Sequence, residues 1–183
     1  MIKKLKFLII IFIALLLIAG AAYYVSYRQN LPQEQILADA FVTITAPQLN
    51  KDSVHEKYLS VALSGKIKTA AFYQAVQGKV QYLVRFNEFA ETCVLESGVK
   101  SIENLLKNDN FVYTAVENKV DNMEGILLNG TFQRNGKEFG LKQQFVKEGN
   151  YFWQILVIFP TSKSNEKRAD NFIKSIKISP PKP

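Results

Sequence analysis

The sequence predicts an α+β domain, an antiparallel sheet covered by helices, preceded by one transmembrane helix. Three observations support this prediction. An unbroken apolar run from Phe7 to Val25 follows a cluster of lysines at the N-terminus. Alternating apolar and polar residues on either side of Asn135-Gly136 are typical of a β-hairpin. Apolar residues at helical spacing from Ala169 to Ile176 predict a helix that covers the sheet.

The N-terminal segment has the features of a transmembrane signal-anchor. Its apolar run of 19 residues would reach about 28 Å as a helix, close to the thickness of a bilayer's hydrocarbon core. Lysines before the run keep the N-terminus in the cytoplasm under the positive-inside rule, and tyrosines gather at the far end, where headgroups lie. The residues assigned to the membrane anchor are Lys3, Lys4, Lys6, Phe7, Val25 and Tyr27.

A cleavable signal peptide is the alternative interpretation of this segment. Its apolar region would be Phe7–Ile18, with a small-residue cleavage site at Ala19-Gly20-Ala21. The uncleaved anchor is favoured because the apolar run continues to Val25. We therefore expect a single-pass protein of the inner (cytoplasmic) membrane with a periplasmic or otherwise extracytoplasmic C-terminal domain. The predicted organisation is a cytoplasmic tip and anchor (1–28), a juxtamembrane linker (29–40), the α+β domain (41–179) and a tail (180–183).

The first elements of the domain follow the linker. Residues 29–40 are polar and read as a linker, although Pro32 could also open a short helix ending near Ala40. The β-branched segment Phe41–Thr45 predicts the first strand. Strand structure is also favoured from Tyr58 to Val76.

Two hairpins and one fully buried strand are expected next. Val80–Phe86 alternates apolar and polar residues, and Gln77-Gly78 separates it from the preceding strand. Asn135-Gly136 is a strong hairpin signal because both central residues of a type I′ turn need positive φ. Tyr151–Pro160 is apolar on both faces, so we expect this strand to be covered on both sides of the sheet.

Two amphipathic helices complete the predicted domain. The first lies within residues 96–108, and its apolar face consists of Val99, Ile102, Leu105 and Leu106. The second follows Ser164 as the expected N-cap. Its apolar positions are Ala169, Phe172, Ile173 and Ile176.

The order of these elements resembles the PsbP family and its bacterial relatives. The similarity is clearest where the tryptophan-bearing strand YFWQILVIFP (151–160) leads to a helix closing on Phe172–Ile176, and it spans Phe41 to Ile178. The resemblance implies an antiparallel sheet sandwiched by helices. It also implies a non-catalytic accessory subunit attached to a larger membrane or secretory assembly. It implies no shared site residues.

The sequence offers few residues for catalysis or metal binding. It has one histidine, His55, and one cysteine, Cys93, whereas a zinc site needs three or four such ligands. A hydrolase using His55 is the enzyme hypothesis that remains open. Glu88 and Glu91 are interpreted as a solvated pair rather than a general acid and base. We therefore expect no enzyme, no catalytic residue, no metal and no cofactor.

The positive charge is concentrated at the two ends of the chain. The net charge is +7, from 23 basic and 16 acidic residues. Because the excess lies beside the membrane segment and in the last 21 residues, the domain between them is nearly neutral, and a nucleic-acid interface is not expected. The basic C-terminal end is predicted to contact a partner through Lys163, Lys167, Arg168, Lys174 and Lys177.

These observations predict a membrane-anchored, non-catalytic accessory or scaffold subunit. Its domain would bind other protein subunits of a membrane or envelope complex through exposed edge strands or the basic C-terminal helix. The alternative is a tethered binding module for a small apolar or lipid-like ligand. That alternative predicts a cavity lined by the aromatic residues Phe139, Phe145, Trp153, Phe159 and Phe172.

Overall fold

The structure, a computed structural model, describes Gly20, Tyr24 and residues 31–53, 66–92 and 94–181 of the 183 residues. His55 and Cys93 lie outside the described residues, and so do all the residues assigned to the anchor: Lys3, Lys4, Lys6, Phe7, Val25 and Tyr27. Among the residues described, no helix has the length and apolar character needed to cross a membrane.

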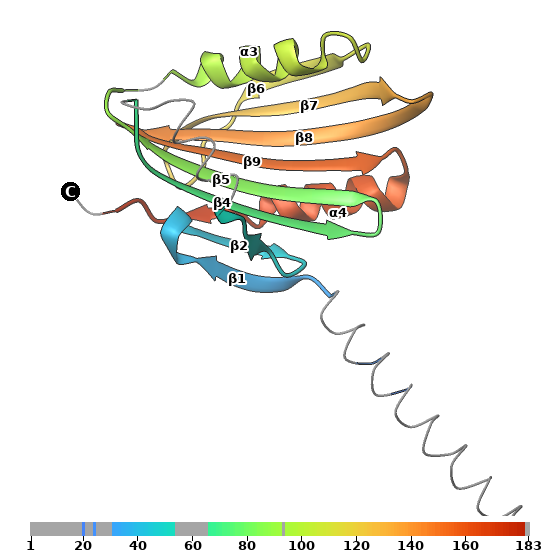
Figure 1. Ribbon diagram of the computed structural model, residues 1–183, viewed down its shortest axis with the longest axis horizontal. Helices are drawn as coiled ribbons and strands as arrows, with labels where there is room; N and C mark the ends of the chain where they lie inside the picture. The colour runs from blue at the N-terminus through green and yellow to red at the C-terminus, as the bar shows by residue number, and fades with distance from the viewer. Residues whose placement is uncertain (1–19, 21–23, 25–30, 54–65, 93, 182–183) are drawn as a thin grey trace, which may run out of the picture.

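Two antiparallel sheets and two helices build the described domain (Figure 1). The smaller sheet has the order β1-β2-β10. Its strands are β1 (Gln33–Leu37), β2 (Val42–Ala46) and β10 (Lys177–Ile178). The larger sheet has seven strands in the order β3-β4-β5-β9-β8-β7-β6. These are β3 (Asn50–Lys51), β4 (Ile67–Gln77), β5 (Val80–Phe89), β6 (Val112–Glu117), β7 (Glu124–Arg134), β8 (Lys137–Glu148) and β9 (Tyr151–Pro160). The helices are α3 (Leu95–Leu106) and α4 (Lys163–Lys174), with a short 3-10 turn η1 (Ala38–Ala40). The predicted α+β class with an antiparallel sheet is confirmed.

Both predicted hairpins form. β7 and β8 meet with Arg134 opposite Lys137, and the two turn residues between them have φ values of 52° at Asn135 and 69° at Gly136. Positive φ at both positions is what a type I′ turn requires. β4 and β5 pair from Gln77 and Val80 onward, at the predicted break in the chain.

β9 is the central strand of the larger sheet, between β5 and β8. Trp153 and Ile155 on one of its faces are fully buried, and Phe152 on the other is only 8% exposed. The prediction that this strand is covered on both sides is confirmed for the face of Trp153, whereas on the face of Phe152 the residues Leu156 and Ile158 are only partly buried.

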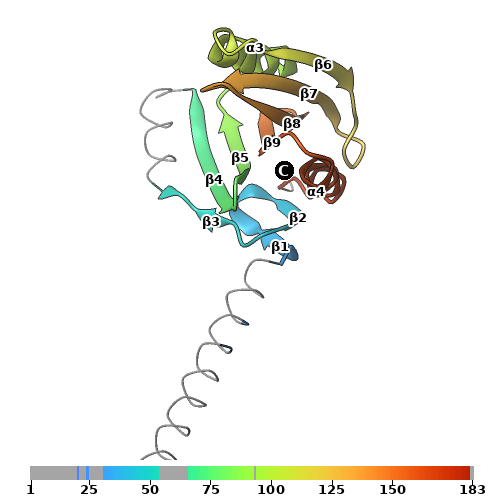
Figure 2. The same ribbon diagram turned by 90° about the vertical axis from the view of Figure 1, so that its right-hand side faces the viewer.

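One face of the larger sheet, which we call the closed face, carries Val84 and Trp153. It packs against the smaller sheet and α4, and Figure 2 shows α4 on the concave side of the curved sheet. The Trp153 indole Nε1 donates a hydrogen bond to the Ala40 carbonyl oxygen at 2.7 Å. This bond joins the larger sheet to η1, the turn between β1 and β2, within the buried core.

The opposite face, which we call the open face, carries Arg85 and Phe152. Only α3 packs on it within the described residues, and this helix lies over β7 and β8. Ile102 and Leu106 of α3 join Phe145 and Phe152 in a second apolar cluster. Because α3 covers less of the sheet than the smaller sheet and α4 do on the closed face, part of the open face of β5 and β9 lies outside this second apolar cluster.

The segment predicted as a linker, residues 29–40, is structured from Gln33 onward. β1 pairs with β2 from Gln33 opposite Ala46 to Leu37 opposite Val42. The linker prediction is therefore wrong for this part, and so is the alternative of a helix opened by Pro32. The strand forms because β2 offers it backbone partners and Leu37 is buried in the core, neither of which its own polar sequence indicates.

Other details also differ from the prediction. β6 and β10 were not expected from the sequence, and β3 lies in a segment that reads as a loop. Leu105, expected on the apolar face of α3, is 71% exposed. The N-cap of α4 is Ser162 rather than Ser164, and its side chain accepts a hydrogen bond from the Asn165 backbone nitrogen at 3.2 Å.

Candidate functional site

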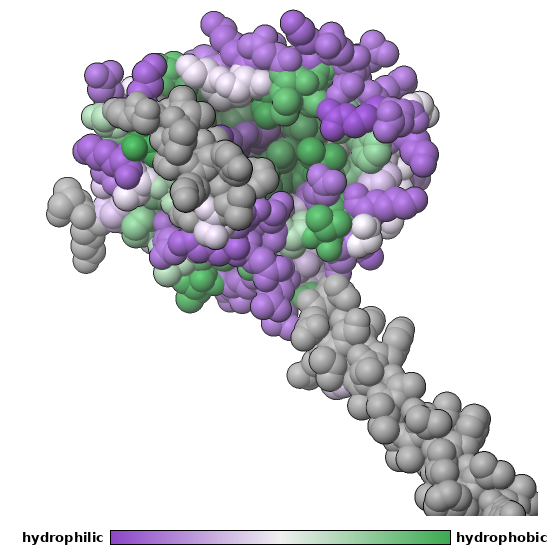
Figure 3. Space-filling view, in the orientation of Figure 1, coloured by the Kyte–Doolittle hydropathy of each residue, from purple (hydrophilic) through white to green (hydrophobic). Residues whose placement is uncertain are grey.

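A groove of about 670 Å³ lies between α3 and the open face of the larger sheet. Figure 3 shows the hollow below α3, with hydrophobic residues gathered beside it. The volume is within the range of ligand-binding pockets, roughly 300–1,000 Å³. Its floor consists of Arg85 and Asn87 of β5 and of Phe152 and Gln154 of β9, and α3 forms one wall.

The alternation of β5 places Arg85 and Asn87 at the floor. Val84 and Phe86 are buried on the closed face, so the residues between and beyond them face the other side of the strand. Arg85 lies directly opposite Gln154 of β9, and Asn87 lies opposite Phe152. A polar strip therefore crosses the open face where α3 does not cover it.

Arg85 is half-buried, and its one hydrogen-bond partner among the described residues is the side-chain amide of Asn87. The guanidinium Nε donates to the Asn87 amide oxygen at 3.3 Å, and no described acid forms an ion pair with it. Burial lowers the pKa of Arg85 because it penalises the charged form, yet an arginine stays charged in a protein. Its terminal nitrogens therefore form an uncompensated cationic point on the floor.

The walls of the groove combine apolar and polar residues. Leu105 of α3 is 71% exposed and Val94, just before the helix, is 55% exposed. Both line the groove together with Ile102, several other wall residues are polar, and Lys66 and Glu91 contribute one charge of each sign. The groove thus combines a cationic floor with exposed apolar side chains on its wall, which suits an amphipathic anion.

Gln143 adds a second unusual polar group to the open face. It is fully buried in β8, and neither its amide nitrogen nor its amide oxygen finds a hydrogen-bond partner in the structure. Its cross-strand neighbours are Leu128 of β7 and Leu156 of β9. A buried amide without partners costs about 1–3 kcal/mol of stability. The buried polar groups of the open face are therefore less completely hydrogen-bonded than those of the closed face.

A second hollow, of about 390 Å³, lies where β6, β7 and β8 approach the start of α4. Lys142 lines it, but its ammonium group is hydrogen-bonded to Asp170 and lies 3.9 Å from Glu166. The charge at this place is compensated within the chain. It is therefore a weaker candidate for a ligand than the groove beneath α3.

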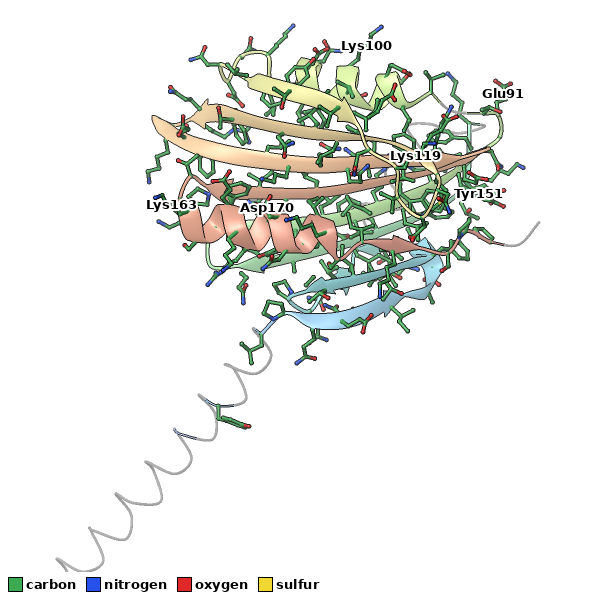
Figure 4. All side chains as sticks on the ribbon, turned by 180° about the vertical axis from the view of Figure 1, so that it is seen from behind. Glu91, Lys100, Lys119, Tyr151, Lys163 and Asp170 are labelled. Carbon is green, nitrogen blue, oxygen red and sulfur yellow. The ribbon has the colours of Figure 1, made fainter. Side chains whose placement is uncertain are left out.

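The basic residues predicted as a partner contact lie away from the groove. Figure 4, seen from behind, shows Lys163 and Asp170 on α4, on the side opposite the groove of Figure 3. The five predicted residues are all exposed: Lys163, Lys167, Arg168, Lys174 and Lys177. Lys177 lies 4.0 Å from Glu34 of β1. Asp170 and Glu166 of α4 lie beside Lys142 of β8, so the helix carries acidic as well as basic side chains.

The remaining candidates from the sequence are distributed as follows. Glu88 accepts a hydrogen bond from Thr69 Oγ1 at 2.9 Å, whereas Glu91 lines the groove. Phe145, Trp153 and Phe172 are buried in the two cores and do not line either hollow. The described residues hold no group of three or more His, Cys, Asp or Glu side chains that could bind a metal ion.

The sequence places Arg85 on the polar side of β5 but gives no reason to choose it as a site residue. A single arginine in an alternating strand normally faces solvent. Only the position of α3 beside that strand turns it into the floor of a groove.

No family model matches the chain, and no curated protein sequence matches it. Solved structures do. The chain is similar to LpqN, involved in cell envelope biogenesis of Mycobacterium tuberculosis, with a TM-score of 0.52, 13% identity, and coverage of 76% of this chain and 83% of LpqN. It is also similar to the Saccharomyces cerevisiae Ran-binding protein Mog1p, with a TM-score of 0.45, 10% identity, and coverage of 80% of this chain and 95% of Mog1p. At such identities the likeness to LpqN shows a related α+β fold alone, and membership in the PsbP family stays a prediction.

Proposed function

We propose that this protein is a membrane-anchored, non-catalytic module of a cell envelope whose domain binds another envelope component in the groove beneath α3. The observation that supports it most strongly is the groove itself, with the half-buried Arg85 on its floor and the exposed apolar residues Val94 and Leu105 on its wall. The fold shared with LpqN, an envelope biogenesis protein, is compatible with such a role.

The anchor supplies the second half of the proposal. The apolar run Phe7–Val25 holds the domain at the outer surface of the cytoplasmic membrane, with the N-terminus inside. Two measurements test this. The full chain should stay in the membrane pellet after alkaline carbonate extraction, and alkaline phosphatase fused after Pro183 should be active. Release by carbonate or an inactive fusion would contradict the anchored orientation.

The groups on the floor support binding rather than turnover. Arg85, Asn87 and Gln154 do not gain or lose protons near neutral pH, so they can hold and orient a ligand but cannot act as general acid or base. A groove built from such groups is suited to retention of a ligand.

Native mass spectrometry of the full chain, purified from its own membranes in mild detergent, tests occupancy of the groove. Wild-type protein should carry a small-molecule adduct, and Ser101→Trp should lose it, because Ser101 lines the groove and tryptophan fills it. Ser164→Trp is the matched control, since Ser164 is exposed on α4, on the other face. A wild-type chain without adduct, or an adduct that persists in Ser101→Trp, would argue against the proposal.

The exposed edge of β6 supports protein docking as a second candidate function. β6 ends the larger sheet, and Val112 and Val116 are 71% and 52% exposed. The strand contains neither Lys nor Pro, residues with which proteins commonly protect sheet edges from pairing. A partner strand could therefore extend the sheet here. A defined partner that co-purifies with the wild type in constant ratio and is lost in Val116→Lys would support this function, and a partner retained by Val116→Lys would exclude the β6 edge.

A further inference from the structure

We propose that the ligand of the groove is an unbranched fatty acid, held by its carboxylate at Arg85 with its chain along the apolar wall of α3. This inference rests on the proposed function, because it identifies the chemical class of what the groove binds.

The head group is indicated by the unused donors of Arg85. Asn87 occupies the Nε–H side of the guanidinium, and no described acid pairs with the rest of it. The terminal nitrogens of an arginine form a planar fork that matches both oxygens of a carboxylate. The side chain of Gln154, directly across the strand pair, makes no hydrogen bond to a described residue and can add an amide donor. One anion with two acceptor oxygens would therefore satisfy the donors on the floor.

The charge of the site favours a head with a single negative charge. Among the described residues, Arg85 is the one cation on the floor, and the other two charged residues of the lining, Lys66 and Glu91, are of opposite sign. The net charge of the lining is therefore close to +1. A carboxylate balances it, whereas a phosphate ester that carries up to two negative charges would need a second cation.

The chain of the ligand is indicated by apolar residues that are exposed at the groove. Leu105 and Val94 are more than half exposed at the groove, and Phe152 and Ile102 continue the same surface inward. Along the open face, Leu156 and Ile158 of β9 are only partly buried. An acyl chain lying over these residues would remove apolar surface from water on both sides of the contact. A peptide strand would find no such match, because the floor is a sheet face whose backbone groups are already paired.

Calorimetric titration of the full chain in a non-ionic detergent, with probes of equal chain length, tests the inference. Decanoate should bind the wild type, and Arg85→Gln should weaken it at least about tenfold, the effect of one lost charge-assisted contact. Decan-1-ol should bind the wild type more weakly than decanoate and should be unaffected by Arg85→Gln. Partition into detergent is the same for every variant, so the ratios between variants report on the groove.

Two variants serve as controls. Lys137→Gln removes an equal charge at the exposed tip of the β7–β8 hairpin and should bind decanoate like the wild type. If Arg85→Gln fails to fold, Arg85→Lys keeps the charge but removes the planar fork, and it should still weaken decanoate binding measurably. Fluorescence of the single tryptophan, the buried Trp153, reports whether each variant is folded.

Each contrary result has a separate meaning. Unchanged decanoate binding in folded Arg85→Gln and Arg85→Lys overturns the role of Arg85. Tighter binding of decyl phosphate than of decanoate by the wild type overturns the carboxylate head. If neither decanoate nor decan-1-ol binds while Ser101→Trp still loses the native adduct, the fatty-acid inference fails and the proposed function stands. If Ser101→Trp loses nothing either, both fail.

Discussion

The two faces of the larger sheet use the same strands for different purposes. On the closed face, the smaller sheet and α4 cover β5 and β9, and Trp153 has its one polar atom bonded. On the open face, α3 is the one described helix and covers less of the same strands, and within the described residues Arg85 and Gln143 lack polar partners for some or all of their polar atoms. Alternation along a strand therefore separates residues that hold the fold from residues free to meet a ligand. Neighbouring positions should respond to substitution in opposite ways.

The largest expected difference is between Trp153 and Phe152. Trp153→Ala removes a fully buried side chain and its hydrogen bond to Ala40, and should lower the free energy of unfolding by about 3–5 kcal/mol. Phe152→Ala should cost less, because the groove already borders this ring. Urea titration of the full chain, followed by circular dichroism, measures both. Equal losses would show that the open face contributes as much packing as the closed one.

The adjacent glutamines Gln143 and Gln144 provide a sharper test. Gln143→Leu removes a buried amide without partners, and should raise the free energy of unfolding by about 1–3 kcal/mol. Gln144→Leu should lower it by about 1 kcal/mol or more, because Gln144 Nε2 donates to the Phe145 carbonyl oxygen at 2.9 Å and Asn118 Nδ2 donates to Gln144 Oε1 at 2.6 Å. The same urea titration measures both changes in the free energy of unfolding. A loss of stability in Gln143→Leu would mean that its amide is satisfied in solution.

The N-caps of α4, on the closed face, and of α3, on the open face, also differ. Ser162 caps α4, whereas Val94, in an extended conformation at the start of α3, offers no side-chain cap. Ser162→Ala should cost about 1 kcal/mol, and Val94→Ser should gain about the same amount. Thermal unfolding of the two variants measures both changes in stability. Should Val94→Ser bring no gain, the end of α3 would already be satisfied by other groups.

The smallest expected effect concerns the surface pair of Lys177 and Glu34. The two side chains are more than half exposed and 4.0 Å apart, and such pairs contribute about 0–1 kcal/mol. Lys177→Gln should therefore leave the urea midpoint nearly unchanged. A defect in partner binding by this variant would then reflect contact with a partner rather than loss of fold. A large drop in the midpoint would instead assign Lys177 a structural role.

Much of the fold could be predicted because its signals are local. The Asn135-Gly136 turn and the apolar strand Tyr151–Pro160 identify themselves by residue type and spacing, and both are found as expected. β1 and β6 could not be predicted in this way, because their sequences are weakly patterned, although each of them pairs with the next strand along the chain. The groove was missed for a different reason, since Arg85 and Leu105 lie twenty positions apart and come together only when α3 packs beside β5.

The sequence by itself determined the turns, the alternation of β5 and β9, the approximate positions of both helices and the prediction of an anchor, since each depends on neighbouring residues. The tertiary structure alone decided which face of the larger sheet is covered by the smaller sheet and α4 and which one, among the described residues, is covered by α3. That choice depends on contacts between segments far apart in the chain, such as Ala40 with Trp153. It is the choice that leaves Arg85 half-buried and short of a counter-charge, and so defines the candidate site.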